Sequence, residues 1–293
     1  MSSPVADHLA IAAQYALPKR VLTQMAGRFA RARLGWLTHA AIARFVARYG
    51  VDMSEAAEPG IASYASFNDF FARALRPDAR PLAAADYICP VDGAISQFGA
   101  IEGGQIFQAK GHFFSTLALL AGDAPLAARF EGGQFATLYL SPRDYHRIHM
   151  PCAGRLARMV YVPGELFSVN PVTARGVPGL FARNERVVCL FETMRGPLAL
   201  VLVGATIVGS MATVWHGVVN PPRTGQVRVF DYAYAPPVEL AQGAEMGRFL
   251  LGSTVVLLWP RGALHFNPDW RAGLGVRMGQ ALGMSLASVT SDP

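Results

Sequence analysis

The chain has 293 residues, 52% hydrophobic and 16% charged, whereas typical globular proteins are about 45–50% apolar and about 25% charged. This composition predicts a large core or a lipid-facing surface, and the length allows one large domain or two small ones. Three scattered cysteines, Cys89, Cys152 and Cys189, include no C-x-x-C pair. They exclude the pattern of a disulfide framework and indicate reduced thiols in a cytosolic setting.

The formal net charge of +6 lies entirely in the first fifty residues. Residues 1–50 carry seven basic side chains and one acidic one, a net of +6, so the remaining 19 basic and 19 acidic side chains cancel. Residues 1–17 lack a basic start followed by an apolar run, so we expect no signal peptide.

Two basic helices are expected between residues 18 and 50. The first, at 18–33, has an apolar face made of Val21, Leu22, Met25 and Phe29. The second is expected to be capped by Thr38 and stopped by Gly50, with an apolar stripe of Ile42, Phe45, Val46 and Tyr49. The arginines of the two helices are Arg20, Arg28, Arg31, Arg44 and Arg48. Such helices suit an anionic membrane surface; the alternative is that the stripes pack on the protein and the arginines are only solvated.

The remainder of the chain is predicted to consist mostly of β-strands. Ser66 is expected to cap a helix over 67–75, and a short helical stretch is expected at 116–120. Ser141-Pro142-Arg143-Asp144 has the form of a helix start, which predicts one turn carrying Tyr145 and His146. Strands are expected at 94–98, 105–109, 135–140, 154–162, 185–192, 198–203, 206–214, 227–231 and 255–259.

The uncharged segment 196–222 is long enough to span a bilayer, but its glycines, valines and threonines fit the two strands at 198–203 and 206–214 better than a transmembrane helix. The expected fold class is therefore α+β. N-terminal amphipathic helices, in a docking region 1–65, are followed by a mostly antiparallel β body, 66–293, with a single active site.

A Gly-Ser pair, Gly252-Ser253, stands inside an apolar, β-branched run. Glycine lacks a Cβ, so the Gly252 carbonyl can be approached closely, and the Ser253 hydroxyl lies one residue beyond it. Attack of the hydroxyl would give an ester, whose elimination gives dehydroalanine and then, by hydrolysis, a pyruvoyl group and ammonia. The alternative is a glycine at a bulge in a buried strand.

Three further polar residues suit acid–base chemistry. Asp92 lies in a Pro-Val-Asp-Gly turn, and His146 and His149 form an H-x-x-H pair with no clear third ligand, so no metal is expected. An imidazole is a suitable general base because it titrates near neutrality. Asp92, a histidine and Ser253 permit a triad-like arrangement, but their spacing does not place them in contact; a turn aspartate and structural histidines remain the alternative.

An ordered set of motifs resembles the bacterial, membrane-associated phosphatidylserine decarboxylases. The most distinctive are Tyr145-His146-Arg147-Ile148-His149 and Leu251-Gly252-Ser253-Thr254. The full set lies at 67–73, 90–93, 110–112, 145–151, 166–170, 181–186, 203–210, 245–249 and 251–254. The resemblance covers most of the chain and is weakest after about Asn267.

The resemblance implies that the proenzyme cuts itself between Gly252 and Ser253, giving chains 1–252 and 253–293. The self-cleavage triad of the family falls on Asp92, His149 and Ser253, and we favour His146 over His149 as proton donor in the second reaction. The implied cofactor is pyruvate, as a covalent pyruvoyl group that forms a Schiff base with phosphatidylserine on the way to phosphatidylethanolamine. Neither pyridoxal phosphate nor a metal is expected.

The expected partners are phosphatidylserine and an anionic membrane surface, with no nucleic acid. The resemblance implies a heterodimer of the two cleavage products, with a homodimer of that pair as an analogy, located peripherally on the cytoplasmic side of the cell membrane. Two other functions stay open. One is a serine hydrolase that uses Ser253, His149 and Asp92 on an external ester, and the other is an unprocessed lipid-binding membrane protein.

Overall fold

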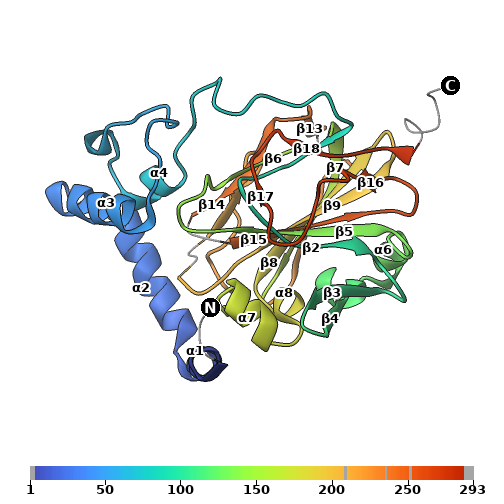
Figure 1. Ribbon diagram of the computed structural model, residues 1–293, viewed down its shortest axis with the longest axis horizontal. Coiled ribbons are helices and arrows are strands. Elements are labelled where there is room, and N and C mark those ends of the chain that lie inside the picture. The colour runs from blue at the N-terminus through green and yellow to red at the C-terminus, as the bar shows by residue number, and fades with distance from the viewer. Residues whose placement is uncertain (1–3, 208–209, 235, 251–252, 287–293) are drawn as a thin grey trace.

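The computed structural model describes residues 4–207, 210–234, 236–250 and 253–286, and has an N-terminal group of helices beside a β body (Figure 1). The α+β prediction is confirmed. The N-terminal elements are α1 (Pro4–Ala16), α2 (Lys19–Arg31), α3 (Trp36–Tyr49), the 3-10 helix η1 (Ile61–Ser63) and α4 (Phe67–Phe71). No helix within the described ranges is both long enough and apolar enough to cross a bilayer.

Helix α2 turns its small and polar side toward the rest of the protein. Its buried residues are Lys19, Thr23, Gly27 and Ala30. The apolar face expected from the sequence is on the outside, with Val21 54%, Met25 61% and Phe29 51% exposed. The alternative in which this stripe packs on the protein is therefore wrong for α2.

Helix α3 differs, because its stripe packs on α4. Ile42 is fully buried, and the Phe45 ring lies edge-on to Phe70 and Phe71. Gly50 ends the helix as predicted, in a left-handed conformation at φ +65°. The predicted Thr38 cap is wrong: the helix begins at Trp36, and the buried Thr38 hydroxyl accepts a hydrogen bond from the Leu34 amide at 3.1 Å.

The β body is organised around a nine-stranded antiparallel sheet, in the order β12-β7-β8-β9-β15-β5-β2-β17, with β13 also paired to β7. Its strands are β2 (Gly93–Ala100), β5 (Gln134–Leu140), β7 (Gly154–Val162), β8 (Arg186–Thr193), β9 (Gly196–Val203), β12 (Arg228–Asp231), β13 (Glu239–Leu240), β15 (Ser253–Trp259) and β17 (Gly275–Val276). Strand β15 lies between β9 and β5. Both faces of β15 are buried, which explains its uninterrupted apolar sequence.

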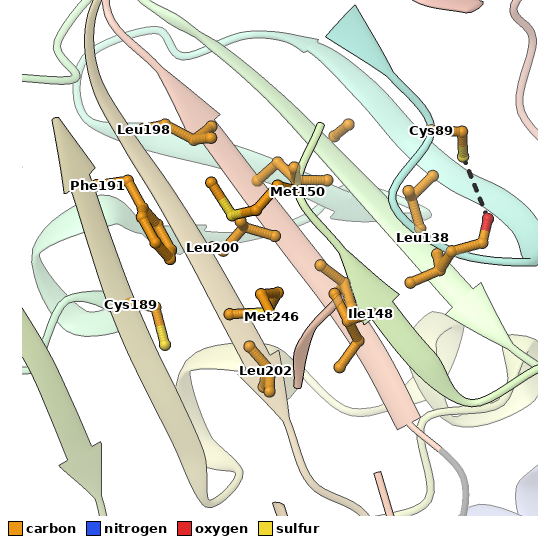
Figure 2. Close-up of a cluster of buried hydrophobic side chains, with 14 of the residues drawn as sticks. Cys89, Leu138, Ile148, Met150, Cys189, Phe191, Leu198, Leu200, Leu202 and Met246 are labelled. Carbon is orange, nitrogen blue, oxygen red and sulfur yellow. Dashed lines mark hydrogen bonds between the residues drawn. The ribbon is translucent and has the colours of Figure 1, made fainter. Parts of the chain in front are cut away.

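Each face of the large sheet is covered. On one face lies a second sheet, β11-β10-β14-β6, whose Ile148 and Met246 pack near Leu200 and Leu202 of β9 (Figure 2). The other face is covered by the hairpin β3–β4 and four short helices. The bounds are β3 (Gln105–Ala109), β4 (His112–Ser115), β6 (Arg147–His149), β10 (Met211–Thr213), β11 (Gly217–Val218), β14 (Glu245–Phe249), α5 (Thr116–Leu119), α6 (Ala124–Ala128), α7 (Pro171–Gly176) and α8 (Leu180–Arg183).

A three-stranded sheet completes the body, formed by β1 (Tyr87–Ile88), β18 (Ala281–Met284) and β16 (His265–Phe266). Three local predictions are wrong. Helix α4 is capped by Ser66 but ends at Phe71, and in the expected strand 206–214 only β10 is formed among the described residues. Residues 141–144 form a turn and no helix: the Asp144 amide donates to the Ser141 carbonyl at 3.0 Å, and the Asp144 carboxylate accepts the Ser141 amide at 2.7 Å.

Candidate active site

Ser253 stands at one corner of the large sheet. It is the first residue of β15, its backbone is paired with Leu140 at the end of β5, and Thr254 faces Tyr139. Strand β14, which ends at Phe249, leads into the segment that holds the Gly-Ser pair. Gly252, the other residue of the predicted cleavage position, lies outside the described residues.

Asp92 lies at the same corner. It directly precedes β2, and Ala94 of that strand faces Tyr139 of β5, which in turn faces Thr254 of β15. Two inter-strand spacings therefore separate the β2 and β15 backbones here, about 10 Å. The register brings the predicted aspartate and serine to one edge of the sheet although 160 positions separate them in sequence.

The Asp92 carboxylate is buried and fully engaged. Arg80 Nε donates to its two oxygens at 3.0 and 3.2 Å, and Arg80 Nη2 donates at 2.5 Å. The Met278 amide donates to Oδ1 at 2.9 Å. Arg80 also pairs with Glu55 at 2.7 Å. The aspartate is thus held by a guanidinium clamp and a backbone amide, a charge-assisted arrangement with little freedom.

His149 ends β6 next to the turn that carries Asp92. Its backbone amide donates to the Pro90 carbonyl at 2.9 Å. Its ring Nδ1 lies 2.8 Å from the Gly243 carbonyl, and its Nε2 lies 3.0 Å from the Tyr145 hydroxyl. The two imidazole nitrogens therefore face Gly243 and Tyr145 rather than the Asp92 carboxylate.

The partners of His149 define its protonation state. A carbonyl oxygen only accepts, so Nδ1 carries the hydrogen and Nε2 presents its lone pair to the Tyr145 hydroxyl. Burial lowers the pKa of His149, and the Gly243 contact and the Glu245 and Asp92 charges oppose that shift. His149 is thus held as a neutral imidazole with a basic Nε2.

His146 is the most enclosed of the predicted residues. It is fully buried, its ring lies 4.1 Å from the Phe71 ring, and its Nδ1 lies 2.7 Å from the Asp144 carbonyl. Its Nε2 has no hydrogen-bond partner among the described residues. Burial lowers the pKa of His146 to about 3, with Arg73 contributing in the same direction. This is a neutral imidazole whose free nitrogen faces a dry environment.

Sequence reasoning missed Tyr145, Arg80 and Gly243 as partners in the site. Tyr145 had a signal, because it lies four residues before His149 in the same motif. Arg80 and the Gly243 carbonyl had none, since only the tertiary fold brings them to Asp92 and His149.

The chain is similar to known proteins over nearly its whole length. A family model described as phosphatidylserine decarboxylase matches residues 67–284, and a second, described as PSD, matches residues 9–50. A phosphatidylserine decarboxylase proenzyme of Acidovorax ebreus (strain TPSY) is 72% identical over 278 residues, 95% of this chain and 98% of that protein. The proenzyme of the same name from Polaromonas naphthalenivorans (strain CJ2) is 68% identical over 290 residues, 98% of this chain and 99% of its own. These matches confirm the resemblance drawn from the motifs.

Proposed function

The chain belongs to the phosphatidylserine decarboxylase family, and we propose that it decarboxylates phosphatidylserine to phosphatidylethanolamine with a pyruvoyl group made from its own Ser253. The observation that carries the proposal is that the sheet register brings Ser253 and Asp92 to one corner, with His149 hydrogen-bonded to the turn that carries Asp92. Each belongs to a different strand or turn, so their convergence is a property of the fold.

The first reaction is self-cleavage. The Ser253 hydroxyl attacks the Gly252 carbonyl carbon, the C–N bond breaks, and an ester links the two residues. Elimination then releases the carboxylate of Gly252 and leaves dehydroalanine, which tautomerises and takes up water to give the pyruvoyl group and ammonia. Holding the hydroxyl and carbonyl in one chain supplies the proximity that this step needs.

His149 is the proposed base for this step. Its neutral state and its basic Nε2 are what proton abstraction from a hydroxyl requires. The Tyr145 hydroxyl covers that nitrogen, so the proton of Ser253 reaches Nε2 either through the phenol or after the phenol moves aside. In the first case Tyr145 relays the proton, and in the second it only positions the base.

Asp92 acts on His149 through space in this proposal. Its negative charge favours the imidazolium that forms when His149 takes the proton, as does that of Glu245. The Arg80 clamp and the Met278 amide fix where that charge sits. A fixed charge costs no reorganisation during the reaction, which is the basis of electrostatic preorganisation.

Ser253 is a suitable place for the pyruvoyl group because β15 is paired with β5 from Ser253 and with β9 from Thr254, and this pairing would hold its register after the cut. The group supplies a carbonyl for the serine amine of the substrate and an electron sink for its decarboxylation. We propose that His146 then delivers a proton from Nε2. Because His146 is neutral in its dry surroundings, the anionic head group must first raise its pKa.

The two cleavage products are expected to stay together as a heterodimer. Strand β15 would begin the small chain of 293 − 252 = 41 residues, and it lies in the centre of the large sheet. Its hydrogen bonds to β5 and β9 and its buried side chains would have to be lost on separation. Separation of the chains is therefore equivalent to unfolding the body.

Region 1–65 is proposed to dock on an anionic membrane. Helix α2 exposes its apolar stripe, and Leu34, Trp36 and Leu37 extend that exposed surface to the start of α3. Surrounding arginines add attraction to anionic lipid. The three free cysteines fit a reducing compartment, which supports peripheral attachment on the cytoplasmic side.

The test is an intact mass spectrum of denatured wild-type protein beside Ser253→Ala. We expect wild type to give two chains broken between Gly252 and Ser253, the small one carrying a pyruvoyl terminus, and to release carbon dioxide from phosphatidylserine. Ser253→Ala should stay one inactive chain, whereas Ser96→Ala, on β2, should be cut like wild type. A wild-type protein that stays uncut, hydrolyses an external ester and is labelled at Ser253 by a serine-directed probe would instead support the serine hydrolase.

A further inference from the structure

A cavity of about 510 Å³ opens beside Asp92, and not all of the arginines that line it pair with a carboxylate. Its arginines are Arg73, Arg80, Arg143 and Arg277. Arg80 is held by Asp92 and Glu55, and Arg277 pairs with Glu55 at 2.7 Å. Arg143 is largely exposed and lies 3.9 Å from Asp144. The fourth arginine, Arg73, is the exception.

Arg73 is a buried cation that contacts no carboxylate of the described residues. It is 5% exposed, and its Nη2 donates only to the Arg143 carbonyl, at a long 3.3 Å. Its Nε has no acceptor within the described part of the chain. The guanidinium carbon lies 5.5 Å from the centre of the Phe70 ring, a contact that compensates little of a buried charge.

A buried guanidinium with no carboxylate in contact is costly even where the Asp92 and Glu55 charges favour it through space, and the protein retains one on the wall of a cavity. Taking a charge out of water without a partner costs several kcal/mol. The same burial lowers the pKa of Arg73. An anionic ligand in the cavity would remove this cost, because a guanidinium binds carboxylate or phosphate oxygens in a two-pronged geometry.

We propose that Arg73 binds the phosphodiester of the lipid substrate, an inference that rests on the proposed function. The substrate offers two anions, its carboxylate and its phosphodiester. A guanidinium on the carboxylate would stabilise the ground state and oppose loss of carbon dioxide. The phosphodiester keeps its charge throughout, so a contact to it strengthens substrate binding without slowing the chemical step.

The position of the cavity agrees with this assignment. It is lined by Asp92, Gly93 and Tyr145, at the corner where Ser253 begins β15. The spacing between the β2 and β15 backbones is about 10 Å. The phosphodiester lies four bonds from the serine amine that must reach the Ser253-derived group, so it must bind within a few ångströms of that group, on the side where the cavity and Arg73 lie.

The test compares Arg73→Met with Arg76→Met, using phosphatidylserine in detergent micelles. Loss of a charge-assisted hydrogen bond predicts a KM for phosphatidylserine at least about tenfold higher in Arg73→Met. The change in kcat should be smaller, because it comes only from the effect of the Arg73 charge on His146. Arg76, three residues away and about half exposed, should leave both constants unchanged. Arg73→Met should unfold at the same or a higher temperature, because an unpaired buried charge is removed.

Two further measurements keep the inference falsifiable. Arg73→Lys retains the charge without the planar fork and should give an intermediate KM, even if Arg73→Met does not fold. Inorganic phosphate should inhibit wild type competitively and Arg73→Met weakly. Loss of phosphate inhibition with an unchanged KM would mean that the cavity takes free phosphate, and would overturn the proposal.

The two proposals also fail differently. A cleaved, active Arg73→Met protein with wild-type KM overturns the Arg73 assignment and leaves the decarboxylase function standing. A wild-type protein that is never cleaved and releases no carbon dioxide overturns both.

Discussion

Helix α2 and strand β15 are both rich in apolar residues, yet they use them in opposite ways. Strand β15 buries the side chains of both its faces inside the body. Helix α2, which lies at the outer side of the molecule in Figure 1, packs its small face inward and leaves Val21, Met25 and Phe29 exposed. Apolar content alone thus does not indicate a core position.

The difference indicates that the two regions are stabilised by different surroundings. The body closes its own core on both faces of the large sheet, as the cluster in Figure 2 illustrates for one face. The α2 surface lacks such a cover within the described chain, and contiguous exposed apolar surface of this kind marks a protein or membrane contact. We therefore expect body substitutions to change folding and α2 substitutions to change membrane binding.

The largest expected effect is on folding. Leu200→Ala, in the centre of β9 and fully buried, should lower the free energy of unfolding by about 2–5 kcal/mol because it leaves a cavity in the packed core. The matched change Met25→Ala on α2 should alter it by less than about 0.5 kcal/mol. Urea unfolding of both variants measures this, and equal losses would contradict the division into two regions.

The second effect is on membrane binding. Replacing Met25 and Phe29 together with Ser should lower the affinity for vesicles containing anionic lipid at least about tenfold, since each side chain would no longer be buried in lipid. The control pair Val229 and Tyr234, exposed on the body, should leave binding unchanged when replaced in the same way. Vesicle sedimentation at low and high salt measures both.

The arginines of α2 and α3 provide a separate test of membrane binding. Gln at Arg20, Arg28, Arg31, Arg44 and Arg48 should reduce binding to anionic vesicles and also remove most of its salt dependence. If the Met25 and Phe29 variant and the arginine variant both bind anionic vesicles as tightly as wild type, the α2 surface would be assigned to a protein partner.

The sequence predicted the elements whose pattern is local. The apolar run of 255–259 and the Gly50 helix stop are fixed by neighbouring residues, and both are found. The turn at Ser141 could not be predicted, because Pro142 and Asp144 suit a helix start and a turn equally well. The outward face of α2 was also undecided, since periodicity defines a stripe without saying what covers it.

The candidate site shows the same limit at the level of single contacts. Residue types and motifs predicted Asp92, His149 and Ser253 as site residues, and the sheet register brings Asp92 and Ser253 to one corner. No local pattern indicated that Arg80 clamps Asp92, or that Gly243 orients His149. Those contacts join segments that are distant in sequence, and only the completed fold positions them.

The smallest expected effect falls on one hydrogen bond inside the body. The Tyr145 hydroxyl donates to Nε2 of neutral His149, so Tyr145→Phe removes a contact that favours the unprotonated ring, and the pKa of His149 should rise. Self-cleavage needs that ring unprotonated, so the midpoint of its acid limb should move to higher pH, by about half to one unit for one hydrogen bond.

The rate of conversion of freshly synthesised precursor into two chains, followed on denaturing gels across pH, measures the midpoint. Tyr139→Phe, on β5 opposite Thr254, is the matched control and should keep the wild-type midpoint. A slower cleavage with the same midpoint in Tyr145→Phe would mean that the phenol only shapes the pocket. A shifted midpoint would mean that a buried hydrogen bond in the body sets the pKa of the proposed base, His149. The exposed surface of α2 needs no contact of this kind to bind a membrane.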